Sequence, residues 1–249
     1  MRTVAATRYV TPLREGGSLP AIVEADDEGL YVIKFRGAGQ GPRALVAELV
    51  AGEVARAVGL DVPEIVFITL DRELARSEPD PEIQDLIRAS AGVNIALDYM
   101  PGSVAFDPVA EQPDAELASA IVWFDALVVN LDRSPRNTNL LMWHGKLRLI
   151  DHGAALYVHH AGGDFAARAK EAFPKIKDHV LLPFASRLAE VDARLAARLT
   201  PNVIEGIVAS IPEDWIAQDA GRETYSRYLN ARLAPPRVFV EEALRARAV

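Results

Sequence analysis

Residues 130–153 read NLDRSPRNTNLLMWHGKLRLIDHG, and this stretch decides the fold. Charged and amide side chains crowd its first ten positions, and a single carboxylate, Asp151, follows its second apolar run. The segments LLMW and KLRL fit two short strands, and the HG between them fits a two-residue turn, so the pattern predicts a β-hairpin over 140–149. Such a hairpin brings the two polar ends of the stretch together.

The polar residues at the open end of this hairpin suit a metal–nucleotide site. Asn137 and Asp151 fall one step off a direct cross-strand pair, within reach of a common ion, and Asp132 lies five residues before Asn137. Mg²⁺ commonly takes one or two protein carboxylates and completes its shell with water and phosphate oxygens. Asp132 then remains to orient a hydroxyl, which is the division of roles found in phosphoryl-transfer sites.

A plainer interpretation of the same residues stays open. Asp132, Asn137 and Asn139 could cap a turn after a buried helix, as Asp and Asn commonly do in loops. Their spacing, the hairpin and Asp151 together favour the metal–nucleotide site.

The rest of the chain divides into a mixed part and a helical part. Strand patterns are expected at 30–36, 64–70 and 94–100, with a helix between the first two that begins near Pro42 and ends before Gly59. The first hundred residues therefore predict a small sheet with one helix, and 78–85 is expected to be an acidic connection. The helices expected in the second part are 115–129, 165–172, 184–199, 202–210, 222–233 and 238–247. We place the boundary near residue 101, which gives a covering domain over 1–100 and a helical catalytic domain over 101–249.

Composition narrows the function classes. The chain has 249 residues, half of them hydrophobic, no cysteine and a net charge of -8. Without cysteine there is no disulfide, thiolate nucleophile or Cys-based metal site, and a helical His pair for zinc is also missing. The negative charge disfavours nucleic acid as a partner. Since no apolar run is long enough to span a bilayer and no secretory signal begins the chain, we expect a cytoplasmic protein without integral membrane association.

The motifs resemble those of a known family. D-R-x-x-x-N at Asp132, Arg133 and Asn137, followed by Ile150-Asp151-His152-Gly153, is similar to the catalytic and metal-binding loops of the HipA-like kinase family, in the phosphoinositide 3/4-kinase-like branch of the protein-kinase fold. The stretches FDALVVN and ALVAELVAGEVARAVGLDVPE resemble the same branch. The resemblance covers roughly residues 10–160. It implies an α+β, two-lobed protein-kinase-like fold with a small N-terminal lobe of sheet and helix and a mainly helical C-terminal lobe.

The resemblance also implies roles for individual residues. Asp132 is the catalytic base, Lys34 holds the α- and β-phosphates, and Glu48 is the ion-pair partner of Lys34. Asn137 and Asp151 are the metal ligands. Further nucleotide contacts are expected at the phosphate-covering loop and the connection between lobes, namely Gly16, Gly17, Ser18, Asp98, Tyr99 and Met100. Taken alone, Lys34 and Glu48 would be read as solvent-facing residues of an edge strand and an amphipathic helix.

The chain departs from the family pattern at three places. Ser134 stands where a His often follows Asp-Arg, His152 replaces the aromatic residue of D-F-G, and REGGS (14–18) is not a G-x-G-x-x-G loop. None of these changes removes an expected metal ligand. The resemblance further implies autophosphorylation at Ser18, or else at Thr11. We expect no toxin role, because we expect 249 residues to be too short for the additional N-terminal subdomain of the HipA toxins and the sequence shows no evident DNA-binding partner element.

The predicted function is that of a phosphotransferase, a HipA-like Ser/Thr kinase that uses ATP and Mg²⁺ and transfers the γ-phosphoryl group to a hydroxyl. A protein acceptor is favoured, with a small molecule or a lipid headgroup as alternatives. A nucleotide-binding pseudokinase that acts as an interaction module and a nucleotide-independent scaffold are the rivals from other classes; turnover tests the first, and stabilisation by Mg-ATP tests the second.

Overall fold

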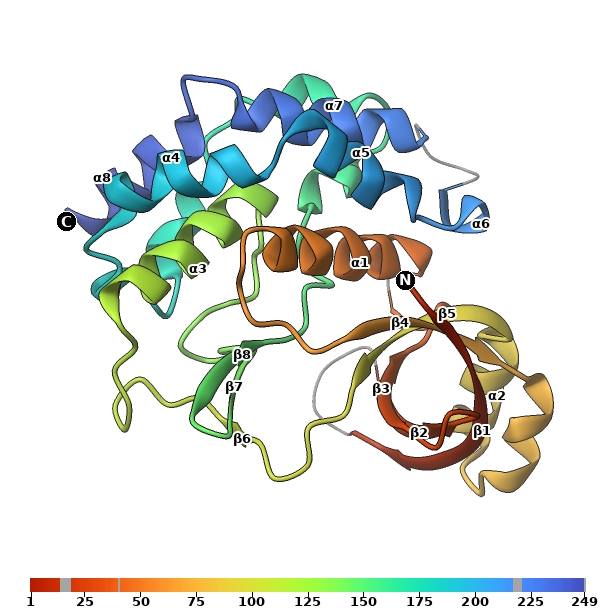
Figure 1. Ribbon diagram of the computed structural model, residues 1–249. Helices are drawn as coiled ribbons and strands as arrows, with labels where there is room; N and C mark the ends of the chain where they lie inside the picture. The colour runs from red at the N-terminus through yellow and green to blue at the C-terminus, as the bar shows by residue number, and fades with distance from the viewer. Residues whose placement is uncertain (14–18, 40, 217–220, 249) are drawn as a thin grey trace.

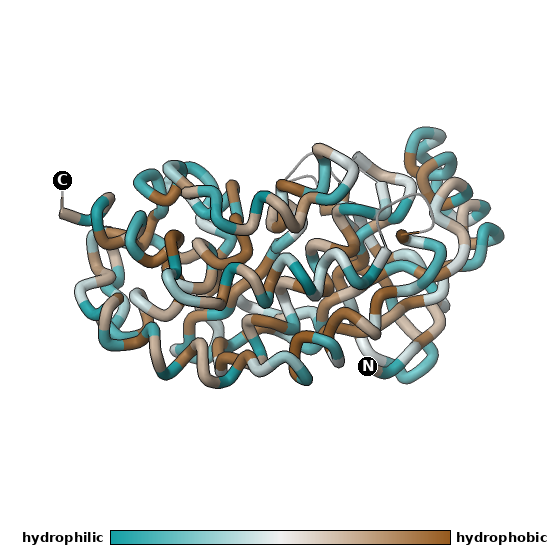
Figure 2. The backbone as a smooth tube through the Cα atoms, turned by 90° about the horizontal axis from the view of Figure 1, so that it is seen from above, coloured by the Kyte–Doolittle hydropathy of each residue, from teal (hydrophilic) through white to brown (hydrophobic). Residues whose placement is uncertain are grey.

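A closed barrel and a helical lobe make up this mixed α+β protein (Figure 1). The computed structural model describes residues 1–13, 19–39, 41–216 and 221–248. Seen from above, the molecule is elongated, and the C-terminus lies at the end away from the barrel (Figure 2). The two-lobed α+β architecture predicted from the sequence is confirmed.

Five strands close the barrel in the order β1-β2-β3-β5-β4. Their bounds are β1 Thr3–Pro12, β2 Ala21–Ala25, β3 Leu30–Lys34, β4 Ile65–Leu70 and β5 Gly92–Asp98. All pairs are antiparallel except β1 with β4, whose parallel pairing closes the circle. Alternate strand residues fill the barrel with a core of its own, because successive side chains point to opposite faces. The end of β3 is thereby held between two neighbouring strands.

Helix α1 (Pro42–Ala57) joins the barrel to the helical lobe. Pro42 takes the first helical position, where its missing N–H costs nothing, and Gly59 follows the end with φ +87°, so both expected boundaries are confirmed. The buried residues of α1 belong to the same hydrophobic cluster as the C-terminal helices, not to the barrel core. In Figure 1 the helix accordingly lies between the barrel and α5.

The predicted hairpin is present. Strand β7 (Leu140–Trp143) pairs with β8 (Lys146–Leu149) in the expected register, and β6 (Val104–Ala105) adds a third strand. The turn residues His144 and Gly145 both have positive φ, +48° and +70°, as a two-residue hairpin turn of this type requires. The hairpin therefore fixes where the segments before residue 140 and after residue 149 emerge.

Helix α3 (Ala115–Val128) is the centre of the helical lobe. Its residues from Ala118 onward are all buried, as the run of apolar residues without a polar face predicts. The helices that pack against it are α4 Leu188–Arg198, α7 Arg222–Leu233 and α8 Val238–Arg247. Helices α5 Pro201–Ala209 and α6 Glu213–Ile216 lie against α1 instead. Between β8 and α4 the chain forms short 3-10 helices, η2 Tyr157–Ala161, η3 Phe165–Arg168, η4 Pro174–Asp178 and η5 Leu182–Phe184. A full helix expected over 165–172 is thus a 3-10 turn.

The N-terminal part is richer than predicted. The strands β1 and β2 were not expected, and α2 (Pro81–Ala89) begins inside the stretch predicted to be a connection, directly after the 3-10 helix η1 (Arg72–Ser77). Asp80 caps α2 by accepting a hydrogen bond from the N–H of Glu82, and Ile83 and Ile87 bury one face. Helix α2 was missed because its sequence is mostly polar and only two of its residues are buried.

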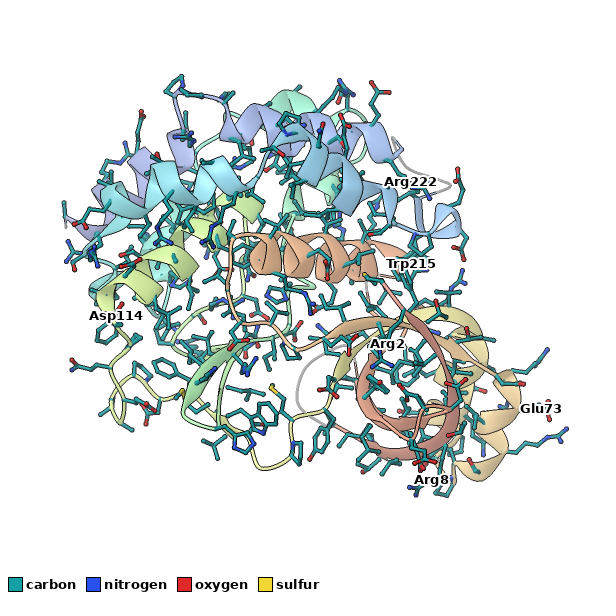
Figure 3. All side chains as sticks on the ribbon, in the orientation of Figure 1. Arg2, Arg8, Glu73, Asp114, Trp215 and Arg222 are labelled. Atoms are coloured by element: carbon teal, nitrogen blue, oxygen red, sulfur yellow. The ribbon has the colours of Figure 1, made fainter. Side chains whose placement is uncertain are left out.

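The two lobes also touch away from α1. Trp215 of α6 lies beside the barrel in Figure 3, with its ring edge-on to Phe67 of β4 at a centroid separation of 5.8 Å. The domain boundary near residue 101 remains a proposal, since α1 shares its core with the later helices. Among the described residues, no helix has the length and apolar character needed to cross a membrane.

Candidate active site

Lys34 and Glu48 form a buried ion pair where the barrel meets α1. Lys34 ends β3, and Glu48 lies on a face of α1 that is fully buried. The Lys34 Nζ is 2.5 Å from the Glu48 Oε2. The sequence expectation that these residues pair is met in the structure, whereas their plainer interpretation as solvent-facing residues is wrong for both side chains.

Asp151 completes this ion pair from the other lobe. It comes two residues after β8 with φ +52°, and its Oδ1 lies 2.5 Å from the Lys34 Nζ. Its side chain is 42% exposed, and its Oδ2 makes no hydrogen bond within the described part of the chain. One oxygen of Asp151 is therefore engaged by lysine while the other stays open to a ligand.

His152 ties the loop after β8 to α1. Its backbone N–H donates to the Glu48 Oε2 over 2.8 Å, and its Nδ1 lies 3.3 Å from the Glu48 Oε1, so the imidazole Nδ1–H faces the carboxylate. The buried ring meets Phe124 edge-on, and its Nε2 has no hydrogen-bond partner in the described part of the chain. Where an aromatic residue would only pack, His152 also holds the Glu48 carboxylate. We call Lys34, Glu48, Asp151 and His152 the Lys34 cluster.

Charge pairing keeps the cluster ionised. Burial alone raises the pKa of Glu48, but Lys34 and the hydrogen bond from His152 outweigh burial and hold this pKa at about 2. Burial likewise opposes the charged form of Lys34, yet Glu48 and Asp151 raise the pKa of the ammonium above its ordinary value. Both groups are charged at neutral pH.

Asp132 lies in the loop between α3 and β7, held by two amides. The Asn137 Nδ2 donates to the Asp132 Oδ2 over 2.9 Å, and the Asn139 Nδ2 donates to the same oxygen over 3.2 Å. The backbone N–H of Asp132 donates to the Asn130 side chain. No described residue donates to the Asp132 Oδ1, which leaves this oxygen as an acceptor for a substrate hydroxyl.

The predicted metal ligands Asn137 and Asp151 lie on two segments that a backbone hydrogen bond joins. No hydrogen bond joins Asn137 to Asp151; the two segments are linked by the backbone, through the Ile150 N–H and the Asn139 carbonyl at 3.1 Å. Asn137 is exposed, whereas Asn139 is only 8% exposed and lies directly beside Ile150. The sequence analysis gave Asn139 no role in the site, although its i, i+2 spacing from Asn137 was a usable signal.

Below the catalytic loop lies a second ionic group, buried throughout. Asp125 of α3 accepts hydrogen bonds from the Asn130 Nδ2 at 2.8 Å, the Arg133 Nε at 2.6 Å and the His179 Nε2 at 2.9 Å. Arg133 also donates to the carbonyl of Asn139. We call Asp125, Asn130, Arg133 and His179 the Asp125 cluster. It fixes both ends of the loop that carries Asp132.

The protonation of the Asp125 cluster follows from its hydrogen bonds. The His179 Nδ1 accepts from the Leu181 N–H, so the ring proton is on Nε2 and is donated to Asp125. Burial lowers the pKa of His179 although Asp125 opposes this, and the histidine is neutral at pH 7. Burial raises the pKa of Asp125, but Arg133 and His179 outweigh it and bring this pKa to about 2. His179 gave no sequence signal, being 54 residues from Asp125.

The residues expected to contact the nucleotide at the connection between the lobes differ in whether their backbone N–H is already hydrogen-bonded. The Asp98 N–H donates to the Glu64 carbonyl and the Tyr99 N–H to the Leu30 carbonyl, both at 2.9 Å. The Met100 N–H makes no hydrogen bond within the described residues, and its side chain is buried. Met100 is therefore the backbone donor available to an adenine, while Asp98 and Tyr99 hold the connection to the barrel.

The remaining predicted residues fall partly outside the described chain. Gly16, Gly17 and Ser18 lie outside the described residues, and Thr11 is an exposed residue of β1 opposite Ile22. In the part of the chain that the structure describes, no cluster of three or more His, Cys, Asp or Glu could hold a metal ion. A site of one carboxylate and one amide is compatible with that finding, because Mg²⁺ takes many of its ligands from water and phosphate.

Comparison with known proteins shows the family and the fold of the chain. A family model described as HipA-like kinase matches residues 7–234. The proinflammatory kinase CtkA of Helicobacter pylori has a similar structure, with a TM-score of 0.59 and 14% identity over 98% of this chain and 99% of that chain. The Golgi casein kinase with Mn/ADP bound is similar at a TM-score of 0.53 and 10% identity over 100% of this chain and 75% of that chain. No curated protein matches the chain. At these identities the structural likeness shows the fold alone, which is that of a two-lobed kinase.

Proposed function

Because this chain belongs to the HipA-like kinase family, we propose that it transfers the γ-phosphoryl group of Mg-ATP to the hydroxyl of a protein serine or threonine. Family membership supports a phosphotransferase, and the acceptor and the metal are the further steps of the proposal. The observation that carries it is the position of the Lys34 Nζ, 2.5 Å from both the Glu48 Oε2 and the Asp151 Oδ1. Glu48 and Asp151, which lie 14 and 117 positions from Lys34 in the sequence, both contact its ammonium group.

The residues of the site divide into binding and catalytic roles. Lys34 is oriented by Glu48 to contact the α- and β-phosphates, and the Met100 N–H is available to the adenine. The open Oδ2 of Asp151, with the amide oxygen of Asn137, would hold Mg²⁺, since a hard cation prefers such oxygens. The bound metal would neutralise charge on the phosphates.

Asp132 positions the acceptor. Its Oδ1 accepts the hydroxyl proton as the hydroxyl oxygen forms a bond to the γ-phosphorus and the bond from that phosphorus to the β,γ-bridging oxygen breaks, with ADP as the leaving group. The two amides on the Asp132 Oδ2 and the Asp125 cluster below keep this carboxylate in place. Catalysis is thus mainly positioning and charge neutralisation.

Intact mass after incubation with Mg-ATP tests the proposal first. We expect whole-phosphate gains on the protein or on an added protein acceptor such as casein, lost with EDTA and lost by at least about a hundredfold in Asp132→Ala. Asp132→Ala should retain thermal stabilisation by Mg-ATP, whereas Asp151→Asn should lose most of it.

Asp85→Ala, an exposed carboxylate of α2, is the matched control and should behave as the unchanged protein. Full activity in Asp132→Ala would contradict its role. Nucleotide stabilisation without any transfer would instead indicate a pseudokinase, and no stabilisation by Mg-ATP would indicate a scaffold.

A further inference from the structure

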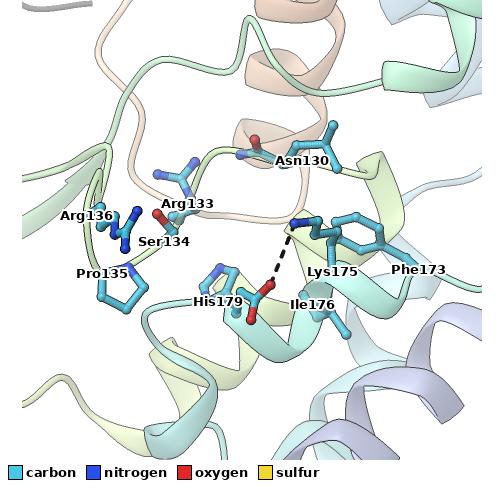
Figure 4. A pocket seen from close by; sticks show the side chains of 11 residues that line it. Asn130, Arg133, Ser134, Pro135, Arg136, Phe173, Lys175, Ile176 and His179 are labelled. Carbon is cyan, nitrogen blue, oxygen red and sulfur yellow. Dashed lines mark ion pairs between the residues drawn. The ribbon is translucent and has the colours of Figure 1, made fainter.

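A cavity of about 430 Å³ opens on the flank of the catalytic loop. One wall is the loop itself, including Leu131 and Arg133, the chain neighbours of Asp132. The other wall is the segment around η4, with Lys175 and His179 (Figure 4). Its size lies within the range of ordinary ligand sites. The cavity is thus lined by the residues directly before and after Asp132 in the catalytic loop.

The lining of this cavity is cationic in a chain that is otherwise acidic. It contains Arg133, Arg136 and Lys175 but a single carboxylate, Asp178, whereas the whole chain carries a net charge of -8. Arg136 makes no ion pair or hydrogen bond with any described residue. Lys175 approaches Asp178 only to 3.9 Å, and both side chains are more than half exposed, so this pair contributes little. The charges of Arg136 and Lys175 are therefore not neutralised by strong ion pairs with described residues.

Arg133 adds a buried hydrogen-bond donor to the cationic lining of the cavity. Its side chain is fully buried, its Nε is held by Asp125, and its Nη1 donates to the Asn139 carbonyl. Its Nη2 has no hydrogen-bond partner among the residues that the structure describes. Buried donors in native proteins are nearly always paired with protein, water or a ligand, so an acceptor belongs beside this guanidinium.

We propose that this cavity binds an anionic group of the protein acceptor, a carboxylate or a phosphate near the hydroxyl that is phosphorylated. The substrate class is then an acidic or phosphorylated segment containing a serine or threonine, and this inference rests on the proposed function in taking a protein hydroxyl as the acceptor. Arg and Lys suit such groups through charge-assisted hydrogen bonds. An anionic bilayer is disfavoured by the charge of the whole chain.

Peptide binding tests the inference without depending on catalysis. Labelled peptides with one serine, flanked by glutamate, by phosphoserine or by lysine, are titrated with the protein and followed by fluorescence anisotropy. We expect the glutamate and phosphoserine peptides to bind about tenfold more tightly than the lysine peptide. The double variant Arg136→Ala/Lys175→Ala should lose this preference, whereas Lys177→Ala, an exposed lysine of the same 3-10 helix outside the cavity lining, should keep it.

Other outcomes overturn the inference. Equal binding of all peptides, an unchanged preference in the double variant, an equal loss in Lys177→Ala, or binding to phosphatidylserine vesicles in place of peptides would each do so. Phosphoryl transfer to the same peptides is measured in parallel. Transfer without an acidic preference contradicts only this inference, and an intact binding preference without transfer contradicts only the proposed function.

Discussion

Two ionic clusters built from similar groups differ in how far they are closed. The Lys34 cluster and the Asp125 cluster each combine a buried carboxylate with a basic side chain and a histidine. In the Lys34 cluster Asp151 is 42% exposed and keeps one oxygen without a partner. In the Asp125 cluster no side chain in the ion pairs is more than 3% exposed. The buried Asp125 cluster holds a loop in position and, among the described residues, leaves only the Arg133 Nη2 without a hydrogen-bond partner, whereas the partly exposed Lys34 cluster keeps a carboxylate oxygen open to solvent.

Disruption of the Asp125 cluster should have the largest effect, a loss in the free energy of unfolding. Asp125→Ala leaves the fully buried Arg133 without its counter-charge, and we expect a loss of about 3 to 5 kcal/mol in the free energy of unfolding, measured by urea denaturation. Asp85→Ala removes the exposed partner of Arg88 and should cost less than about 1 kcal/mol. Equal costs for the two variants would mean that the Asp125 cluster does not support the loop.

Replacement of Lys34, the cation of the Lys34 cluster, should lower phosphoryl transfer strongly and the free energy of unfolding only moderately. Lys34→Met takes away the group expected on the phosphates, so phosphoryl transfer should fall by at least about a hundredfold. Glu48 keeps its hydrogen bonds from His152, and the loss in unfolding free energy should therefore be smaller than that of Asp125→Ala. Lys177→Met is the control for a lysine-to-methionine change at an exposed site. A stability loss as large as that of Asp125→Ala, or retained transfer, would refute the comparison.

Acid should weaken both clusters in a window of pH below about 4.5, and the Asp125 cluster also in an upper window below about 6.5. The folded pKa of His179 lies below its ordinary value of 6.5, so the unfolded chain binds the proton first and stability falls as pH drops below about 6.5. The pKa values of Asp125 and Glu48 are held at about 2, below 3.8 and 4.5, and their contribution is present above about pH 4.5 and lost as pH falls toward 2.

Unfolding free energies measured from pH 7 to pH 3 check both windows. His179→Gln, whose amide can still donate to Asp125 but does not titrate, should flatten the upper window and leave the lower one. An unchanged upper window in this variant would show that His179 is not its source.

The smallest expected difference lies between the two amides on Asp132. Asn137→Ala removes an exposed side chain and should lower transfer about tenfold at limiting Mg²⁺ with little change in stability, whereas Asn139→Ala should cost about 1 kcal/mol of unfolding free energy. The Mg²⁺ concentration dependence of transfer decides between them. If only Asn139→Ala shifts that dependence, the metal ligand is Asn139 and the assignment of Asn137 is wrong.

The sequence by itself determined the hairpin, α1 and the order of the motifs. These elements rest on local chemistry: the turn residues of the β7–β8 hairpin, Pro42 at the start of α1 and an apolar pattern along α3. It also predicted Asp151 from the hairpin, but Lys34 and Glu48 only through resemblance to a family, because a charged residue on a strand or helix has no local signal that it will be buried. By contrast, β1 and β2 were missed; most of β1 beyond Ala6 is not buried, so its sequence lacks the alternation of a half-buried strand, and its pairing with β4 is non-local.

Only the tertiary structure decided which charges meet. His179 reaches Asp125, and His152 reaches Glu48 across 104 residues. No periodic pattern in the sequence predicts either contact, because each depends on how distant helices, strands and loops pack together. The tertiary structure also left Arg133 with an unpaired donor beside a cavity whose walls are about 40 residues apart in the chain, between Arg133 and Phe173. Local propensity specifies elements, whereas burial energetics, acting between distant elements, selects the charged groups that hold the site and those that stay open to ligands.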